Sequence, residues 1–201
     1  MKYAVAAAAL LAGCMSLGKV PPHEYYVLND LRTAATLSMR GSQNDRALLI
    51  SETSVSPFYD TQSLVFSRAP GQRAYYQFAA WTERPGSRLT ELLIHRFYAR
   101  GSFRSVAATT AGVKGDLVLN TRLEELYHDA SAGRGSVRVE MSAVLVDRVQ
   151  RTVVARHDFA QSASTESDTA AAAVVAFDRA VTALLDEESA WVEDMARPAP
   201  R

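Results

Sequence analysis

The second half of the chain alternates apolar and polar residues over long runs, the pattern of antiparallel strands with one buried and one wet face. Residues 133–136 and 148–151 suit hairpin connections between these runs. The runs of this predicted antiparallel meander are 102–108, 116–129, 136–148 and 152–164. Arg138 and Glu140 face away from its apolar side. The apolar residues that share a side within their strand are Leu117, Leu119 and Leu123, then Val137, Val139, Met141, Ala143 and Leu145.

The first half contains shorter runs that are rich in aromatic and β-branched residues. The Pro70-Gly71 dipeptide predicts a hairpin between two of them, and Pro57 separates another pair. Residues 32–46 follow neither periodicity and are predicted to form a loop. The predicted strands are 24–30, 47–53, 63–68 and 73–81.

Two segments have the 3.6-residue periodicity of amphipathic helices. The first is predicted to be capped by Ser87 and to end at Gly101, where a left-handed residue is expected. The second covers residues 167–195. Their apolar faces consist of Leu89, Leu92, Leu93 and Phe97 in the first, and Val174, Phe177, Val181, Leu184 and Trp191 in the second. Two helices on a mostly antiparallel sheet make an α+β fold, a two-layer sandwich.

The last turns of the second helix are acidic. Glu187, Glu188, Glu193 and Asp194 lie near its C-terminus, where negative charge opposes the helix dipole. We expect this end either to fray or to dock onto another surface.

The N-terminal residues have the pattern of a signal peptide. Lys2 supplies a positive charge, and residues 4–11 form an apolar run that is too short to span a bilayer. Cys14, the only cysteine, ends a motif that resembles the bacterial lipobox, in which the cysteine sulfur receives a diacylglycerol and the chain is cut before it. The motif consists of Leu11, Ala12, Gly13 and Cys14. An ordinary secretory signal with an accidental cysteine is the alternative.

This motif divides the chain into a signal peptide at 1–13, a lipidated tether at 14–24, a folded domain at 25–195 and a tail at 196–201. Pro21 and Pro22 favour an extended tether, whose ten residues after Cys14 reach at most about 35 Å. No later run has the ~20 apolar residues of a membrane-spanning helix, so lipid would be the only anchor. Met15 stands where inner-membrane lipoproteins of this kind usually have Asp, which favours the periplasmic face of the outer membrane.

Composition fits one globular domain, with 48% apolar residues. The 22 Lys and Arg residues balance 22 Asp and Glu residues, so no nucleic-acid partner is expected. Most basic residues are arginines, whose planar fork binds carboxylate or phosphate, and lipid headgroups or acids of a partner are candidate ligands. High-GC codon usage explains the same bias without any function.

Catalytic motifs are absent from the sequence: it has no GxSxG, no HExxH, no CxxC and no phosphate-binding glycine loop. The histidines His23, His95, His128 and His157 are scattered, and only Glu91 lies at helical spacing from one of them, His95. That pair is more typical of a solvated helix contact than of a metal site. We therefore expect no catalytic residue, no metal and no cofactor.

Aromatic pairs are a second candidate binding feature. Tyr25-Tyr26 and Tyr75-Tyr76 lie in predicted strands, where neighbouring side chains more often divide between the core and the surface. Trp81 is likewise expected to be a core residue.

The whole pattern resembles the ABC-type transport auxiliary lipoproteins, the group that includes the PqiC-like proteins. The most distinctive residues are Trp81-Thr82-Glu83-Arg84-Pro85 before the first helix, close to the family's Trp-Ala-Glu-Pro, with Thr82 in place of Ala and Arg84 inserted. The resemblance implies a non-catalytic accessory subunit that docks the MCE-family periplasmic protein of an ABC transporter. Such a subunit would help phospholipids pass between membranes.

Two other functions stay open at this point: a lipoprotein that activates a cell-wall synthase or another envelope complex, and a lipid-anchored hydrolase. Synthase activators usually have long disordered tethers, whereas this one is short. Docking would use either the exposed sheet faces or the acidic helix end. A homo-oligomer is expected if the bridging partner is a ring.

Overall fold

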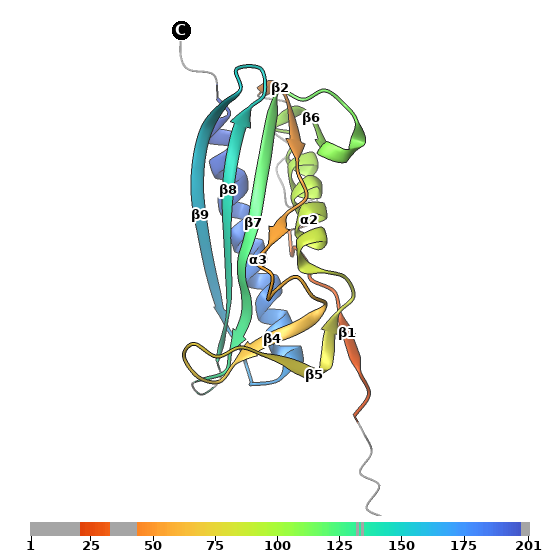
Figure 1. Ribbon diagram of the computed structural model, residues 1–201, viewed down its shortest axis with the longest axis vertical. Helices are drawn as coiled ribbons and strands as arrows, with labels where there is room; N and C mark the ends of the chain where they lie inside the picture. The colour runs from red at the N-terminus through yellow and green to blue at the C-terminus, as the bar shows by residue number, and fades with distance from the viewer. Residues whose placement is uncertain (1–20, 33–43, 132, 134, 198–201) are drawn as a thin grey trace, which may run out of the picture.

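The computed structural model describes residues 21–32, 44–131, 133 and 135–197. They form strands and two long helices that lie in two layers (Figure 1). In chain order the elements are β1 (Glu24–Tyr26), β2 (Asn44–Ile50), β3 (Ser54–Val55), β4 (Ser63–Ser67), β5 (Ala74–Trp81), α2 (Pro85–Arg100), β6 (Phe103–Ala108), the 3-10 helix η2 (Thr109–Ala111), β7 (Leu117–Asp129), β8 (Ser136–Asp147), β9 (Thr152–Ser164) and α3 (Ala170–Met195).

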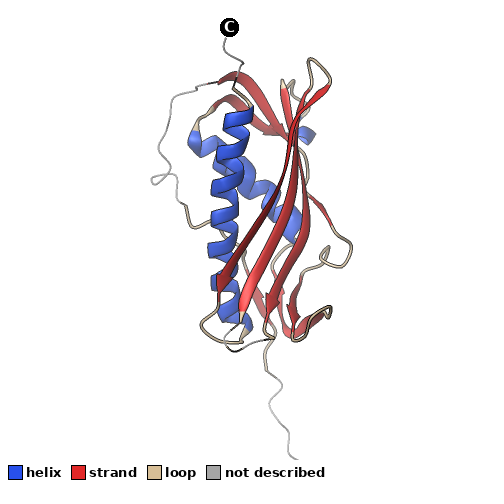
Figure 2. Ribbon diagram, turned by 90° about the vertical axis from the view of Figure 1, so that its left-hand side faces the viewer, coloured by secondary structure: helices blue, strands red, loops and turns tan. Residues whose placement is uncertain are grey.

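Both helices cover the same face of a curled sheet (Figure 2). The core lies between the two layers, because the predicted apolar faces of the helices and of β7 and β8 point at one another. Trp81 is only 2% exposed and its ring meets Phe177 of α3 edge-on, with the ring centroids 5.5 Å apart. The α+β fold with two helices packed on a sheet is thus confirmed, and Trp81 is a core residue.

Strand β7 organises the sheet. On one edge it pairs with β8 along its whole length, antiparallel, and β8 pairs in the same way with β9. On the other edge three short strands follow one another in chain order, all parallel to β7: β2 beside Leu117–Leu119, β3 beside Arg122–Leu123 and β4 beside His128–Asp129. The predicted meander is therefore correct for β7, β8 and β9.

The prediction of a mostly antiparallel sheet is wrong. Five of the eight strand pairings in the described residues are parallel, since β1 also runs parallel to β5 and β6 to β2. Parallel pairing needs a long crossover, and here the partners are far apart in sequence: Leu48 lies beside Leu117. The short apolar runs of the first half of the chain contain no sequence feature that identifies so distant a partner strand.

Three local predictions also need correction. Asn44–Arg46 belong to β2 although they fell in the predicted loop, and β1 covers only Glu24–Tyr26. Helix α2 begins at Pro85 instead of being capped by Ser87, because proline suits the first helical position, where an N–H lacks a partner anyway. Gly101 does end the helix in the left-handed conformation, with φ 60°.

The acidic end of α3 docks onto the end of α2. The Arg100 guanidinium donates to both carboxylate oxygens of Glu193, over 2.5 and 2.6 Å. Ser102, just after α2, donates to the same carboxylate. One of the two expected outcomes, docking, is thus observed, and the surface concerned belongs to the domain itself.

Glu188 is the exception within this acidic group, because its side chain lies in the core. It is 0% exposed, on the same stripe of α3 as Leu184, Leu185 and Val192. Neither of its carboxylate oxygens has a hydrogen-bond partner within the described residues. Burial disfavours the charged form and raises the pKa of Glu188 from 4.5 to about 8, so the carboxyl is protonated at neutral pH.

Glu188 should make stability fall with rising pH. Between pH 4.5 and about 8 the unfolded chain loses the Glu188 proton while the folded chain keeps it, so a higher pH favours unfolding by up to about 1.4 kcal/mol per pH unit. Urea unfolding of Glu188→Gln should show a stability that rises relative to wild type across this window. Glu187→Gln is the exposed control. Parallel curves for Glu188→Gln and wild type would contradict the prediction.

Candidate functional site

Residues 27–32, which we name the strap, run from β1 across both helices. Leu28 is buried, and its carbonyl oxygen accepts a hydrogen bond from Arg88 Nε of α2 over 2.8 Å. The strap also follows α3: the Asn29 N–H donates to Asp178 Oδ1 and the Leu31 N–H to Thr182 Oγ1, each over 2.8 Å. The segment after β1 is thus bound to the domain by its backbone as well as by a core side chain.

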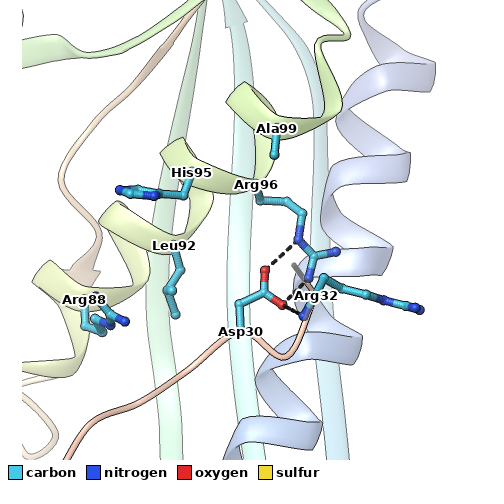
Figure 3. A pocket seen from close by; sticks show the side chains of 7 residues that line it. All are labelled: Asp30, Arg32, Arg88, Leu92, His95, Arg96 and Ala99. Atoms are coloured by element: carbon cyan, nitrogen blue, oxygen red, sulfur yellow. Dashed lines mark hydrogen bonds and ion pairs between the residues drawn. The ribbon is translucent and has the colours of Figure 1, made fainter. Parts of the chain in front are cut away.

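Arg96 of α2 holds the strap from the other side (Figure 3). Its side chain is 0% exposed, and it makes a bidentate pair with Asp30 of the strap, Nε to Oδ2 at 2.8 Å and Nη2 to Oδ1 at 2.6 Å. Its remaining nitrogen, Nη1, donates to Asp186 of α3. Arg32 of the strap reaches the second oxygen of Asp186 over 2.9 Å. These four residues, the Arg96 cluster, join strap, α2 and α3.

Charge balance explains how the fully buried guanidinium of Arg96 is tolerated. Two guanidinium groups face two carboxylates, so no buried charge is left unpaired. Burial alone would raise the pKa of Asp186, but the hydrogen bonds from Arg32 and Arg96 outweigh it and hold that pKa below 3.8. The carboxylate is therefore charged at every physiological pH.

A cleft of about 250 Å³ opens beside the cluster, between the strap and α2. The lining groups are Asp30, Arg32, Arg88, Leu92, His95, Arg96 and Ala99, none of which is a serine, threonine or cysteine nucleophile. The Arg96 guanidinium is saturated by its two carboxylates. Arg88 is occupied by the Leu28 carbonyl and by Glu91. This geometry holds the strap in place against α2.

The domain has two ends, set by the direction of α3 (Figure 1). At the tether end, Pro21 and Pro22 lie beside Thr169 and Ala170, where α3 begins. At the far end, the β8–β9 turn with Val149 lies beside Met195, where α3 stops. The 26 residues of α3 separate these ends by about 39 Å at 1.5 Å per residue.

The far end exposes apolar and cationic side chains together. Val149, within the turn, is 74% exposed, and Val153, at the start of β9, is 47% exposed. Val113 is 52% exposed in the neighbouring loop, where the Asp116 carbonyl accepts from the Arg148 N–H over 2.9 Å. The structure records no ion pair for Arg148 or Arg151 with any residue that it describes.

The histidines do not form a catalytic group. His95 is exposed at the cleft, His23 lies against Tyr25, and His157 packs on Trp191. His128 is buried with Nδ1 2.7 Å from the Tyr76 hydroxyl, and burial lowers its pKa below 6.5. Within the described ranges no serine or threonine hydroxyl is hydrogen bonded to a histidine, and no three potential metal ligands gather.

The aromatic pairs divide less cleanly than expected. Tyr25 is 65% exposed and Tyr75 45%, while their neighbours Tyr26 and Tyr76 are half-buried against the core. Leu11, Ala12, Gly13 and Cys14, the predicted cleavage and lipidation residues, lie outside the described residues and stay a prediction. No helix in the described part of the chain has the length and apolar content to cross a bilayer.

The Arg96 cluster was missed in the sequence, although a signal for it exists. Arg96 follows Leu89, Leu92 and Leu93 at helical spacing, which places a charge in the buried stripe of α2. A guanidinium there needs buried carboxylates. Nothing local indicates that Asp30 and Asp186 supply them.

The family model of the ABC-type transport auxiliary lipoprotein component matches residues 26–187. The chain belongs to this family. Two solved structures share the fold of the auxiliary lipoprotein. Protein XCC0632 from Xanthomonas campestris is 21% identical with a TM-score of 0.77, and the match covers 86% of this chain and 95% of that one. The hypothetical protein CT253 from Chlamydia trachomatis is 9% identical with a TM-score of 0.56, and the match covers 76% of this chain and 98% of that one. No curated protein matches it. The family is one of transport auxiliaries, not a known enzyme family.

Removing Arg96 should destabilise the auxiliary lipoprotein strongly. Arg96→Leu leaves two carboxylates without their shared partner and should cost about 3 kcal/mol, near the lower limit for buried pairs because Asp186 keeps contact with water. The triple variant Asp30→Leu/Arg96→Leu/Asp186→Leu should lose less, since the one charge that then lacks a partner, Arg32, has a half-exposed side chain that water can solvate. Urea unfolding measures both.

The control is Arg84→Leu, which removes an exposed pair with Asp60 (3.2 Å) and should cost less than about 1 kcal/mol. Hydrogen exchange at the Asn29 and Leu31 amides should accelerate in Arg96→Leu only. Equal losses in Arg84→Leu and Arg96→Leu would show that the cluster does not hold the strap.

Proposed function

We propose that this auxiliary lipoprotein is lipidated at Cys14, faces the periplasm from the outer membrane, and acts as a non-catalytic docking subunit of an MCE-type ABC lipid transport system. In this role it supports the movement of phospholipids between membranes and the integrity of the outer membrane. The observation that carries the proposal is the match of residues 26–187 to a family of transport auxiliaries.

The position of the tether supports this role. Six residues lie between Cys14 and Pro21, so the Cα atoms of these two residues are at most about 25 Å apart when the chain is extended. An anchor at Cys14 therefore keeps the tether end near the bilayer. The Arg96 cluster joins the strap to both helices, so the tether enters the domain at a fixed place, and the far end lies about 39 Å away along α3.

The far end supports docking by its chemistry. Val149 lies beside Val154 and Met195, and apolar side chains grouped on a surface are typical of a site that a partner covers. Arginines without carboxylate partners suit an acidic partner. We place the contact with the MCE-family protein on Val113, Val149, Val153, Arg148 and Arg151. Of the two surfaces considered from the sequence, the acidic helix end is already engaged with α2 through Arg100 and Glu193.

The anchor is tested by Cys14→Ser. The variant should fold like wild type but leave the membrane fraction for the soluble periplasmic fraction, because no thioether to a diacylglycerol can form. Outer-membrane barrier function, measured by detergent sensitivity, should then drop to that of a deletion strain. Mass spectrometry of wild type should find the lipid on Cys14. A bare mature N-terminus, or an intact barrier in the variant, would overturn the proposal.

The docking surface is tested by Val149→Asp, with Val175→Asp as the matched control. Val175 is 54% exposed on α3, so both changes put a charge on an exposed valine. Crosslinking in cells should capture an MCE-family protein with wild type and with Val175→Asp, and about tenfold less with Val149→Asp. Capture of a cell-wall synthase in its place would favour the alternative function.

A further inference from the structure

The tether end contains a hollow of about 680 Å³, within the range of roughly 300–1,000 Å³ typical of small-molecule sites. The strand β5 forms its floor, and Pro21 and Pro22 form one wall. It exists because β1 pairs only with Ala79–Trp81, so that the Ala74–Phe78 stretch has no strand on that side among the described residues.

The walls of the hollow are aromatic and partly open to solvent. Phe66 and Phe78 are half-buried, and Tyr75 at the rim is 45% exposed. Tyr75 is held by stacking on Phe58, with ring centroids 4.9 Å apart and planes 11° from parallel, and its hydroxyl donates to the Phe58 carbonyl over 3.0 Å. These contacts preform an apolar surface that a flexible alkyl chain can fill.

Arg68 provides the polar group of this hollow. Its side chain is exposed, with the guanidinium carbon 5.4 Å from the Phe66 ring centroid, and no carboxylate in the described ranges forms an ion pair with it. Glu24 also lines the hollow, but its carboxylate accepts a hydrogen bond from the Tyr26 hydroxyl. An arginine beside aromatic rings is the combination that binds the phosphate and the upper acyl chain of a lipid at a membrane surface.

We propose that this hollow binds a phospholipid of the host membrane, with one acyl chain between Phe66 and Phe78 and the phosphate at Arg68. The tether favours this occupant: Pro21 is itself a wall of the hollow, and the six residues between it and Cys14 hold the hollow within about 25 Å of the bilayer. The inference rests on the anchor of the proposed function but not on its transporter partner.

The test uses the full mature chain with Cys14→Ser, so that no attached lipid competes. Vesicles of phosphatidylethanolamine and phosphatidylglycerol carry a trace of phosphatidylethanolamine with a diazirine at the end of one acyl chain. After illumination, mass spectrometry should locate the adducts on Phe66 and on residues 75–78. Adducts spread evenly over the surface, or none, would overturn the proposal.

Two variants make the test specific. Arg68→Glu should reduce labelling of the hollow about tenfold, the loss expected for one charge-assisted contact with phosphate, whereas Arg148→Glu at the far end should leave it unchanged. Phe78→Ser should also reduce labelling, and its thermal unfolding must show that it folds. A diazirine diacylglycerol lacks the phosphate, so it should label the Cys14→Ser protein as weakly as the phospholipid probe labels the Arg68→Glu variant. Equal labelling by the phospholipid probe and the diacylglycerol probe would show that Arg68 does not bind the phosphate, and would contradict the proposal.

The covalent anchor is the competing occupant. Lipidated wild type in the same vesicles should be labelled like Cys14→Ser. Protection of the hollow in wild type alone would show that the anchor's own acyl chain fills it, and would overturn the assignment to a membrane phospholipid. Since no transporter is present, loss of docking in cells leaves these results unaffected, and the two proposals fail separately.

Discussion

The buried guanidinium of Arg96 is the constraint on which the arrangement of this domain depends. A charge in the apolar stripe of a helix is tolerated only when carboxylates come to it, and here one comes from the strap and one from α3. The same ion pairs that neutralise Arg96 therefore fasten the segment after β1 onto both helices. The chain that enters the domain at β1 is thus held by both helices and does not hang as a free terminus.

The second constraint is the length of β7. Its 13 residues give one edge long enough for β2, β3 and β4 to lie in sequence along it, while β8 and β9 extend the sheet on the other side. The sheet is therefore long and curled, and α3 lies along it with nearly the same reach. An elongated domain has two distinguishable ends, and Pro21, where the described chain begins, lies at one of them.

The elements with strong local periodicity could be predicted from the sequence. The meander of β7, β8 and β9 and the two helices follow from side-chain alternation and from apolar faces such as Leu89, Leu93 and Phe97. The parallel pairings could not, because Leu48 and Leu117 meet only through tertiary packing. The partners Asp30 and Asp186 of Arg96 were hidden for the same reason, and the lipobox residues, which the sequence singles out most clearly, lie outside the described residues.

The proposed docking role needs a defined orientation, and the two constraints together contribute to it. The Arg96 cluster couples the tether to the domain, and α3 places the hollow with Arg68 and the valines near Val149 at opposite ends. In the proposed arrangement a phospholipid held at the tether end would add a second membrane contact to the anchor. Two contacts restrict tilting far more than one flexible tether does, so the far end would be presented to its partner in a defined direction.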